Sequence, residues 1–143
     1  MKGINWLGVV LGLIAGQVIG FLWYGVLFQR RWMELNGLDP DAPMEMSMDD
    51  NLAMGAGAVV TLVVVIGLAI LIKRIGAQTL MGGAKWGLFA AFLFGATTVA
   101  LRALYSTEPF GLDTWCLWSI DAFYLLVYFP VAGALIGGVG KRT

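Results

Sequence analysis

The chain alternates between long apolar stretches and short polar ones. Apolar runs cover residues of about 4–28, 52–72, 80–104 and 114–139. Each run is long enough to cross about 30 Å of hydrocarbon as a helix rising about 1.5 Å per residue. The pattern therefore predicts an all-α fold, an integral membrane four-helix transmembrane bundle. Residues 29–51 are the one sizeable polar segment and are expected to form a loop outside the membrane.

Composition supports a membrane protein with a single domain. Hydrophobic residues make up 59% of the 143 positions and charged residues only 13%, with a mean hydropathy of +0.83. A soluble domain typically has about a quarter charged residues. The length favours one transmembrane domain over residues 1–143. The formal net charge is zero, so no nucleic-acid partner is expected.

The two signs of charge separate along the predicted topology. Six of the nine basic residues lie near the chain ends, in the turn after residue 72 or at the start of the third run: Lys2, Lys73, Arg74, Lys85, Lys141 and Arg142. All nine acidic residues lie toward the opposite side: Glu34, Asp39, Asp41, Glu45, Asp49, Asp50, Glu108, Asp113 and Asp121. Because basic residues concentrate in cytoplasmic segments, both termini are predicted to be cytoplasmic, in the inner (cell) membrane.

The ends of the runs carry expected signals. Asp49 or Asp50 is a candidate cap for the second helix, Thr79 for the third, and Asp113 or Thr114 for the fourth. Aromatic residues near the outer ends are typical of membrane interfaces: Trp23, Tyr24, Trp32, Tyr105, Trp115 and Trp118.

Small residues recur at four-residue spacing in three of the runs. This spacing places them on one helix face, where they let two backbones approach closely in lipid. The predicted packing positions are Gly8, Gly12, Gly16, Gly20, Gly87, Gly95, Gly133 and Gly137. The pattern leaves open whether the packed helices belong to one chain or to different copies.

Two charges lie inside the predicted spans on the outer half, Arg102 and Asp121. They are expected to meet across the hairpin of the third and fourth runs, because a charge in hydrocarbon is costly unless it is paired or hydrated. One interpretation is an ion pair that fixes the hairpin. The other is a polar site for a substrate or a proton.

Further polar residues extend this candidate intramembrane site. Tyr124 and Tyr128 follow Asp121 by three and seven residues and share its helix face, and Thr98 precedes Arg102 by four. Gln17 and Tyr24 lie one heptad apart on the first run. These residues are expected either to line a polar pocket that opens outward or to hold helices together.

Little in the sequence indicates catalysis. The chain has no histidine and one cysteine, Cys116, so no metal site, no cofactor and no enzyme activity are predicted. Met44, Met46 and Met48 alternate with polar residues in the acidic loop. An amphipathic segment on the membrane is favoured there over a metal site.

Two groups of residues resemble a bacterial membrane-protein family known as domain of unknown function 1761. The first runs from Asn5-Trp6 through Gly20-Phe21-Leu22-Trp23-Tyr24 and Trp32-Met33 to Gly37-Leu38. The second includes Gly83 and Gly87, Thr97-Thr98, Ile120-Asp121-Ala122-Phe123-Tyr124 and Gly133-Ala134-Leu135-Ile136. The resemblance covers nearly the whole chain. It implies four helices, supplies no substrate, and draws attention to Trp23, Tyr24, Asp121 and Tyr124.

Two functional hypotheses are compatible with these sequence features. The glycine pattern favours a structural or accessory membrane protein, embedded in the lipid bilayer as a homo-oligomer or with other membrane subunits. The alternative is a transporter or channel for a small solute, an ion or a proton, with its polar site at Asp121 and Arg102.

Overall fold

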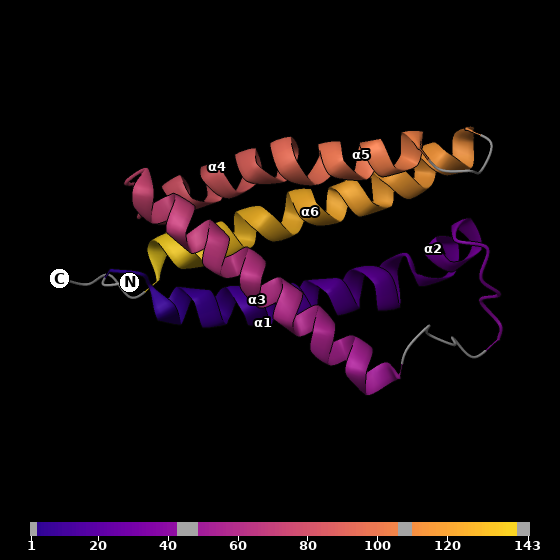
Figure 1. Ribbon diagram of the computed structural model, residues 1–143, viewed down its shortest axis with the longest axis horizontal. Helices are drawn as coiled ribbons and strands as arrows, with labels where there is room; N and C mark the ends of the chain where they lie inside the picture. Colours follow the sequence, from indigo (N-terminus) through magenta and orange to yellow (C-terminus); the bar gives the residue numbers. More distant parts are fainter. Residues whose placement is uncertain (1–2, 43–48, 106–109, 140–143) are drawn as a thin grey trace.

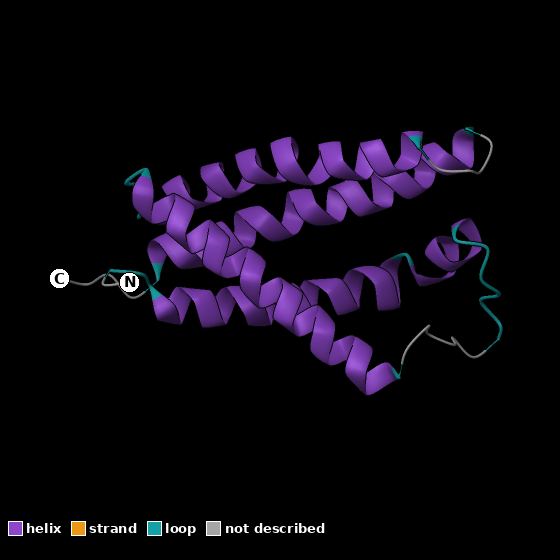
Figure 2. Ribbon diagram, viewed as in Figure 1, coloured by secondary structure: helices purple, strands orange, loops and turns teal. Residues whose placement is uncertain are grey.

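The structure, a computed structural model, describes residues 3–42, 49–105 and 110–139, and within these ranges it is helical with no strand (Figures 1 and 2). The helical elements are α1 (Trp6–Leu22), η1 (Trp23–Leu27), α2 (Gln29–Leu35), α3 (Asp50–Arg74), α4 (Leu80–Ala90), η2 (Ala91–Ala96), α5 (Thr97–Leu104) and α6 (Leu112–Gly138). They build four helices long and apolar enough to cross a membrane: Trp6–Leu27, Asn51–Arg74, Leu80–Leu104 and Leu112–Gly138. The predicted all-α, four-span fold class is confirmed.

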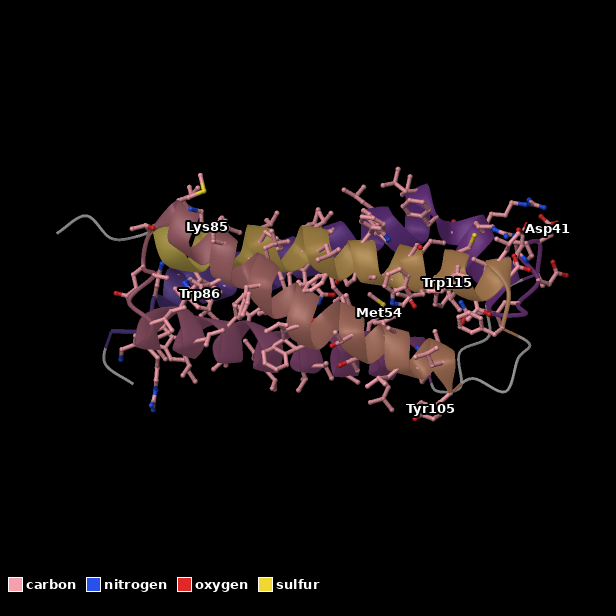
Figure 3. All side chains as sticks on the ribbon, turned by 90° about the horizontal axis from the view of Figure 1, so that it is seen from above. Asp41, Met54, Lys85, Trp86, Tyr105 and Trp115 are labelled. Carbon is pink, nitrogen blue, oxygen red and sulfur yellow. The ribbon has the colours of Figure 1, made fainter. Side chains whose placement is uncertain are left out.

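The bundle has two distinct ends. At the terminal end, α1 begins, α6 ends and α3 turns into α4; at the loop end lie α2 and the start of α6 (Figure 1). Figure 3 places Lys85 and Trp86 near the terminal end and Asp41 and Trp115 near the loop end. The charges of the described residues therefore separate along the long axis of the bundle.

Helix ends follow the predicted signals in two of three cases. The Asp49 side chain accepts from the backbone N–H groups of Asn51 and Leu52, and the Thr79 side chain caps α4. The prediction for the fourth helix was wrong by a few residues. Its cap is Gly111, whose N–H donates to Thr114 Oγ1 at 3.3 Å, so Thr114 stabilises the first turn from within.

Three local features differ from the sequence-based expectation. Two stretches inside the spans, η1 and η2, are π-helical, with backbone hydrogen bonds that close over one extra residue. The stretch Gln29–Leu35, expected as loop, forms the short helix α2, anchored by Met33, which is 3% exposed. The chain turns into α2 at Phe28, with φ −121° and ψ 7°. The expected amphipathic segment at Met44–Met48 lies outside the described residues.

The closest helix contact joins α4 to α6. A Cβ added at Gly83 would clash with the carbonyl oxygen of Gly133, and one added at Gly133 would clash with that of Gly83. Gly87 faces the Phe129 carbonyl oxygen in the same way, and Gly137 faces that of Thr79. Because backbone atoms rather than flexible side chains occupy this space, the two helices can approach this closely only through glycine.

The glycines of the first run also face helices of the same chain. A Cβ at Gly8 would lie 2.6 Å from Ile136 Cα, and one at Gly16 would lie 2.8 Å from the Tyr128 ring. Gly12 lies beside Val65 and Ala132, Gly20 beside Tyr124, and Gly95 beside Leu125. All eight predicted packing positions thus meet neighbours within one chain. α6 lies at the centre, since it packs against both α1 and α4.

The first half of α3 diverges from the other helices. α3 contributes Val65, Leu68, Ala69 and Ile72 to the core, but residues 51–64 include no buried residue. A Cβ added at Gly55 would meet no atom within 4 Å. Figure 1 shows this half of α3 leaving the bundle toward the loop end.

Candidate functional site

Asp121 lies on α6 and is held by two aromatic side chains, one from the first span and one from the short helix that follows it. Tyr24 donates its hydroxyl to Asp121 Oδ1 at 3.0 Å, and Trp32 donates its indole N–H to the same oxygen at 3.3 Å. Tyr24 comes from η1 and Trp32 from α2, so the turn at Phe28 brings both donors to one carboxylate. Asp121 Oδ2 accepts no hydrogen bond from any described residue.

Aromatic rings surround this carboxylate. The Tyr24 ring lies 5.6 Å from the Trp32 ring and 5.1 Å from the Tyr124 ring, measured between centroids. Trp23 lies 6.4 Å from Tyr124 and donates its indole N–H to the Ile120 carbonyl oxygen at 3.0 Å. The aromatic groups therefore fix the position of Asp121 and of its stretch of α6 from one side.

A cavity of about 610 Å³ lies on another side of Asp121, between α2, α5 and the start of α6. Its polar lining residues are Glu34, Asn36, Arg102, Asp113, Thr114 and Asp121. Apolar lining comes mainly from Leu35, Val99, Leu117 and Trp118. The volume falls within the range of about 300–1,000 Å³ that is common for small-molecule sites.

Arg102 and Asp121 both line this cavity, but they form no ion pair. The ion pairs among the described residues all involve Arg30 or Arg31, so the expected direct contact between Arg102 and Asp121 was wrong. The aromatic donors Tyr24 and Trp32 hold Asp121 from one side, and Arg102 attracts it only through space, without contact. Arg102 forms neither a hydrogen bond nor an ion pair with any described residue.

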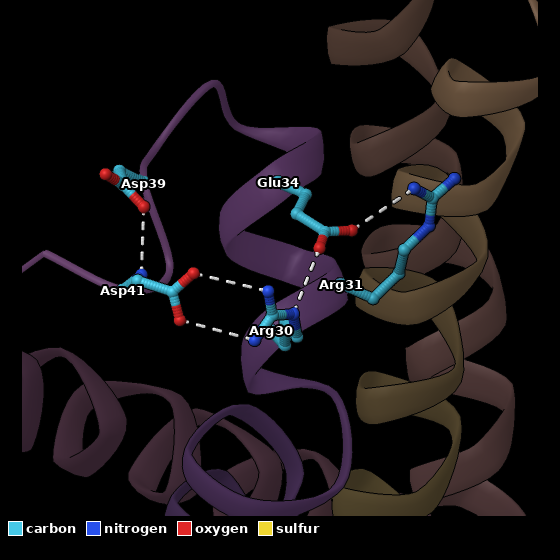
Figure 4. Close-up of polar contacts among 5 residues, drawn as sticks. All are labelled: Arg30, Arg31, Glu34, Asp39 and Asp41. Atoms are coloured by element: carbon cyan, nitrogen blue, oxygen red, sulfur yellow. Dashed lines mark hydrogen bonds and ion pairs between the residues drawn. The ribbon is translucent and has the colours of Figure 1, made fainter.

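The other charges near the cavity are paired with one another. Arg31 contacts Asp113 at 2.6 Å and Glu34 at 3.5 Å, while Arg30 contacts Glu34 and Asp41, each at 3.4 Å. Figure 4 shows Arg30 between Glu34 and Asp41 and the contact of Arg31 with Glu34. A hydrogen bond with the Cys116 thiol, together with those to Asp113 and Glu34, raises the pKa of Arg31. These pairs tie α2 to the first turn of α6.

Of the seven predicted site residues, only Arg102 and Asp121 line the cavity. Tyr24 and Tyr124 belong to the aromatic group beside Asp121, and three others have separate contacts. Thr98 is exposed and donates to the Phe94 carbonyl oxygen of its own helix. Gln17 donates to Thr61 Oγ1 on α3 at 3.4 Å. Tyr128 stacks on Tyr124 with centroids 5.9 Å apart and is buried against Gly16; its hydroxyl has no hydrogen-bond partner among the described residues. The structure thus brings Tyr24, Tyr124 and Asp121 together and leaves these three outside.

Sequence reasoning missed the role of Trp32 and of the cavity residues Glu34 and Asp113. Trp32 was interpreted as an aromatic residue of the membrane interface. Its contact with Asp121 was not predicted, because that contact depends on the turn at Phe28. The one signal for it was the resemblance, which includes Trp32 beside Trp23-Tyr24. Among the described residues, no three His, Cys, Asp or Glu side chains come together as a possible metal site.

Four helices that are long and apolar enough to cross a membrane, with α6 packed through glycines against α1 and α4, define a multi-pass transmembrane helical protein. The family model described as "Protein of unknown function (DUF1761)" matches residues 7–137, and the chain belongs to that family. The resemblance inferred from the sequence is therefore confirmed. No curated protein and no solved structure matches the chain.

Proposed function

We propose that the protein lies in the inner (cell) membrane with both termini in the cytoplasm and binds a small polar solute at its outer end, as the binding part of a transporter. The observation that carries the proposal is the cavity beside Asp121. One carboxylate oxygen is held by Tyr24 and Trp32, and the cavity of about 610 Å³ is also lined by Arg102. A half-buried charge on a membrane helix is costly, and such charges commonly mark solute or ion pathways.

The contacts of the glycines weaken the case for association between chains through the glycine faces. The glycine pattern had favoured association between chains, but its glycines pack against α3, α4 and α6 of the same chain. The charge distribution supports the orientation, since the segments that connect the spans at the terminal end are the more basic ones.

Cysteine labelling tests both access and orientation. Asp121→Cys, made in a Cys116→Ser background, is expected to react in intact cells with a membrane-impermeant thiol reagent, because the cavity reaches residue 121 from the loop end. Thr143→Cys should react only after the cells are opened. Mass shift of the labelled protein measures both reactions.

The matched control for this labelling is Ala122→Cys, because Ala122 is the next residue of the same helix and is only 2% exposed. It should stay unlabelled under both conditions. An unreactive cysteine at position 121 in folded protein would contradict an outward-opening solute site. Labelling of Thr143→Cys in intact cells would reverse the proposed orientation.

A second function, an accessory protein that associates with further copies of itself or with other membrane subunits, is favoured by one observation. The first half of α3 contributes no buried residue, and Val59 and Val63 are 61% and 66% exposed. A helix segment that contacts its own chain on one side only, as at Thr61, leaves its other side as a surface for a second transmembrane helix.

Oxidative crosslinking tests this association. Val63→Cys, again without Cys116, is expected to give a disulfide-linked dimer in native membranes on mild oxidation, since this position of α3 faces outward. Ala69→Cys on the same helix is 2% exposed and should give none. If Val63→Cys also stays monomeric, lipid rather than a second copy covers this part of α3.

A further inference from the structure

The cavity holds one unpaired charge of each sign. Asp121 uses only Oδ1 for its two hydrogen bonds from Tyr24 and Trp32. Arg102, on the opposite helix of the hairpin, has no hydrogen-bond or ion-pair partner among the described residues. Both side chains line the same space without touching each other. A ligand between them would therefore meet a free carboxylate oxygen on one side and a free guanidinium on the other.

The remaining charges around the cavity do not change this balance. Asp113 is paired with Arg31 at 2.6 Å, and Glu34 is shared between Arg30 and Arg31 at 3.4 Å and 3.5 Å. Both acidic residues are therefore engaged in ion pairs before any ligand arrives, although Arg30 and Arg31 are shared with Asp41 as well and the exposed cluster keeps one net negative charge. A simple cation would leave Arg102 unpaired, and a simple anion would leave Asp121 with an uncompensated charge.

The size and the lining of the cavity argue for a molecule rather than a bare ion. A volume of about 610 Å³ exceeds what a monatomic ion needs and suits a small molecule. Trp118 lines the same space, with its indole N–H bonded to the Ala96 carbonyl oxygen at 3.2 Å, so its ring is held in place. An aromatic ring and a carboxylate that line one cavity favour an ammonium group.

On these grounds we infer that the cavity binds a small zwitterion, with its ammonium group at Asp121 and its phosphate or carboxylate group at Arg102. This inference rests on the proposed solute site and names the ligand class that the site selects. A guanidinium binds phosphate or carboxylate oxygens through two parallel N–H groups. Such chemistry occurs both in free solutes and in the phosphoethanolamine headgroup of a lipid, and the cavity lies at the end of the spans where a headgroup would be.

Thermal stabilisation of the full-length protein tests the inference. In detergent, O-phosphoethanolamine and γ-aminobutyrate supply the two kinds of zwitterion, and ethanolamine and inorganic phosphate supply one charge each. At least one zwitterion is expected to bind about tenfold or more tightly than either single-charge compound, because it makes two charge-assisted contacts instead of one. Lipid nanodiscs with and without phosphatidylethanolamine test the lipid as the source.

Substitutions assign the two ends of the ligand. The Arg102→Met variant should no longer bind the zwitterion more tightly than ethanolamine. The Asp121→Asn variant should no longer bind the zwitterion more tightly than inorganic phosphate. Lys85→Met, which removes an exposed charge at the far end of the bundle, is the matched control and should keep both. Stabilisation by phosphatidylethanolamine alone, lost in the Arg102 and Asp121 variants, would also support the inference and identify the lipid headgroup.

Two results separate the inference from the function it rests on. If ethanolamine binds as tightly as every zwitterion, and Arg102→Met has no effect, the zwitterion is excluded while a cationic solute site at Asp121 stands. If no compound and no lipid stabilises the protein, the inference is wrong, and the labelling of Asp121→Cys then decides separately whether an outward-opening site exists.

Discussion

Replacing Gly83 with alanine is expected to destabilise the protein by about 1–3 kcal/mol or more, the usual cost of forcing extra volume into a packed interface. The new methyl group would meet the backbone carbonyl oxygen of Gly133, which cannot rotate away as a side chain would. The α4–α6 contact would have to open, and with it the neighbouring approach of Gly87 to Phe129. Denaturant or thermal unfolding in detergent, followed by helical circular dichroism, measures the loss.

Gly55→Ala is the matched control. It adds the same methyl group inside a membrane helix, α3, but at a position where a Cβ meets no atom within 4 Å. Its stability should be unchanged or slightly higher, because alanine restricts the unfolded chain more than glycine does. Equal effects of the two substitutions would mean that the close contact of α4 and α6 does not exist.

Removing the carboxylate of Asp121 is expected to produce the second large effect. Asp121→Leu leaves the hydroxyl of Tyr24 and the indole N–H of Trp32 without their acceptor, and an unsatisfied buried donor costs about 1–3 kcal/mol. Tyr24→Phe alone should cost less, because it removes one donor and leaves the bond from Trp32. Unfolding of the variants in detergent provides the free energies.

A double-mutant cycle identifies the partner of Asp121. The effects of Tyr24→Phe and Asp121→Leu should deviate from additivity by about 0.5–3 kcal/mol, as for residues in one hydrogen-bond network. The effects of Arg102→Met and Asp121→Leu should couple more weakly than those of Tyr24→Phe and Asp121→Leu, because the two charges attract each other only through space and no ion pair joins them. Strong coupling of Arg102 to Asp121, with none to Tyr24, would contradict the geometry of the site.

The helices were predictable because membrane spans are encoded locally. Four long apolar runs, the cap at Thr79 and the four-residue glycine spacing each depend on a few neighbouring residues. Which helix meets which glycine was not predictable, since the spacing describes one face and not its partner. The structure assigns Gly83 to Gly133 and Gly16 to Tyr128.

The site was predictable only in its centre. Asp121 was identified because a charge inside an apolar run needs a partner. The wrong partner was chosen because Arg102 carries the opposite charge, whereas the actual donors, Tyr24 and Trp32, are uncharged and lie far away in the sequence. Trp32 reaches the site through α2, a short helix in a segment whose polar composition had indicated a loop.

Each of the two π-helical segments changes which face of the helix the residues after it occupy. Each closes its hydrogen bonds over one residue more than an α-helix, so the side chains that follow are rotated by about 100° relative to an uninterrupted α-helix. Glycine spacing read from Gly83 therefore cannot be extended past η2 to decide where Arg102 points. In the first span, η1 begins only at Trp23, and Gly20 and Tyr24 both lie beside Tyr124, so the glycine face continues to Tyr24. In the third span, the residues after η2 are rotated relative to the glycines of α4, so α4 packs its glycines against α6 while Arg102, on α5, lines the cavity.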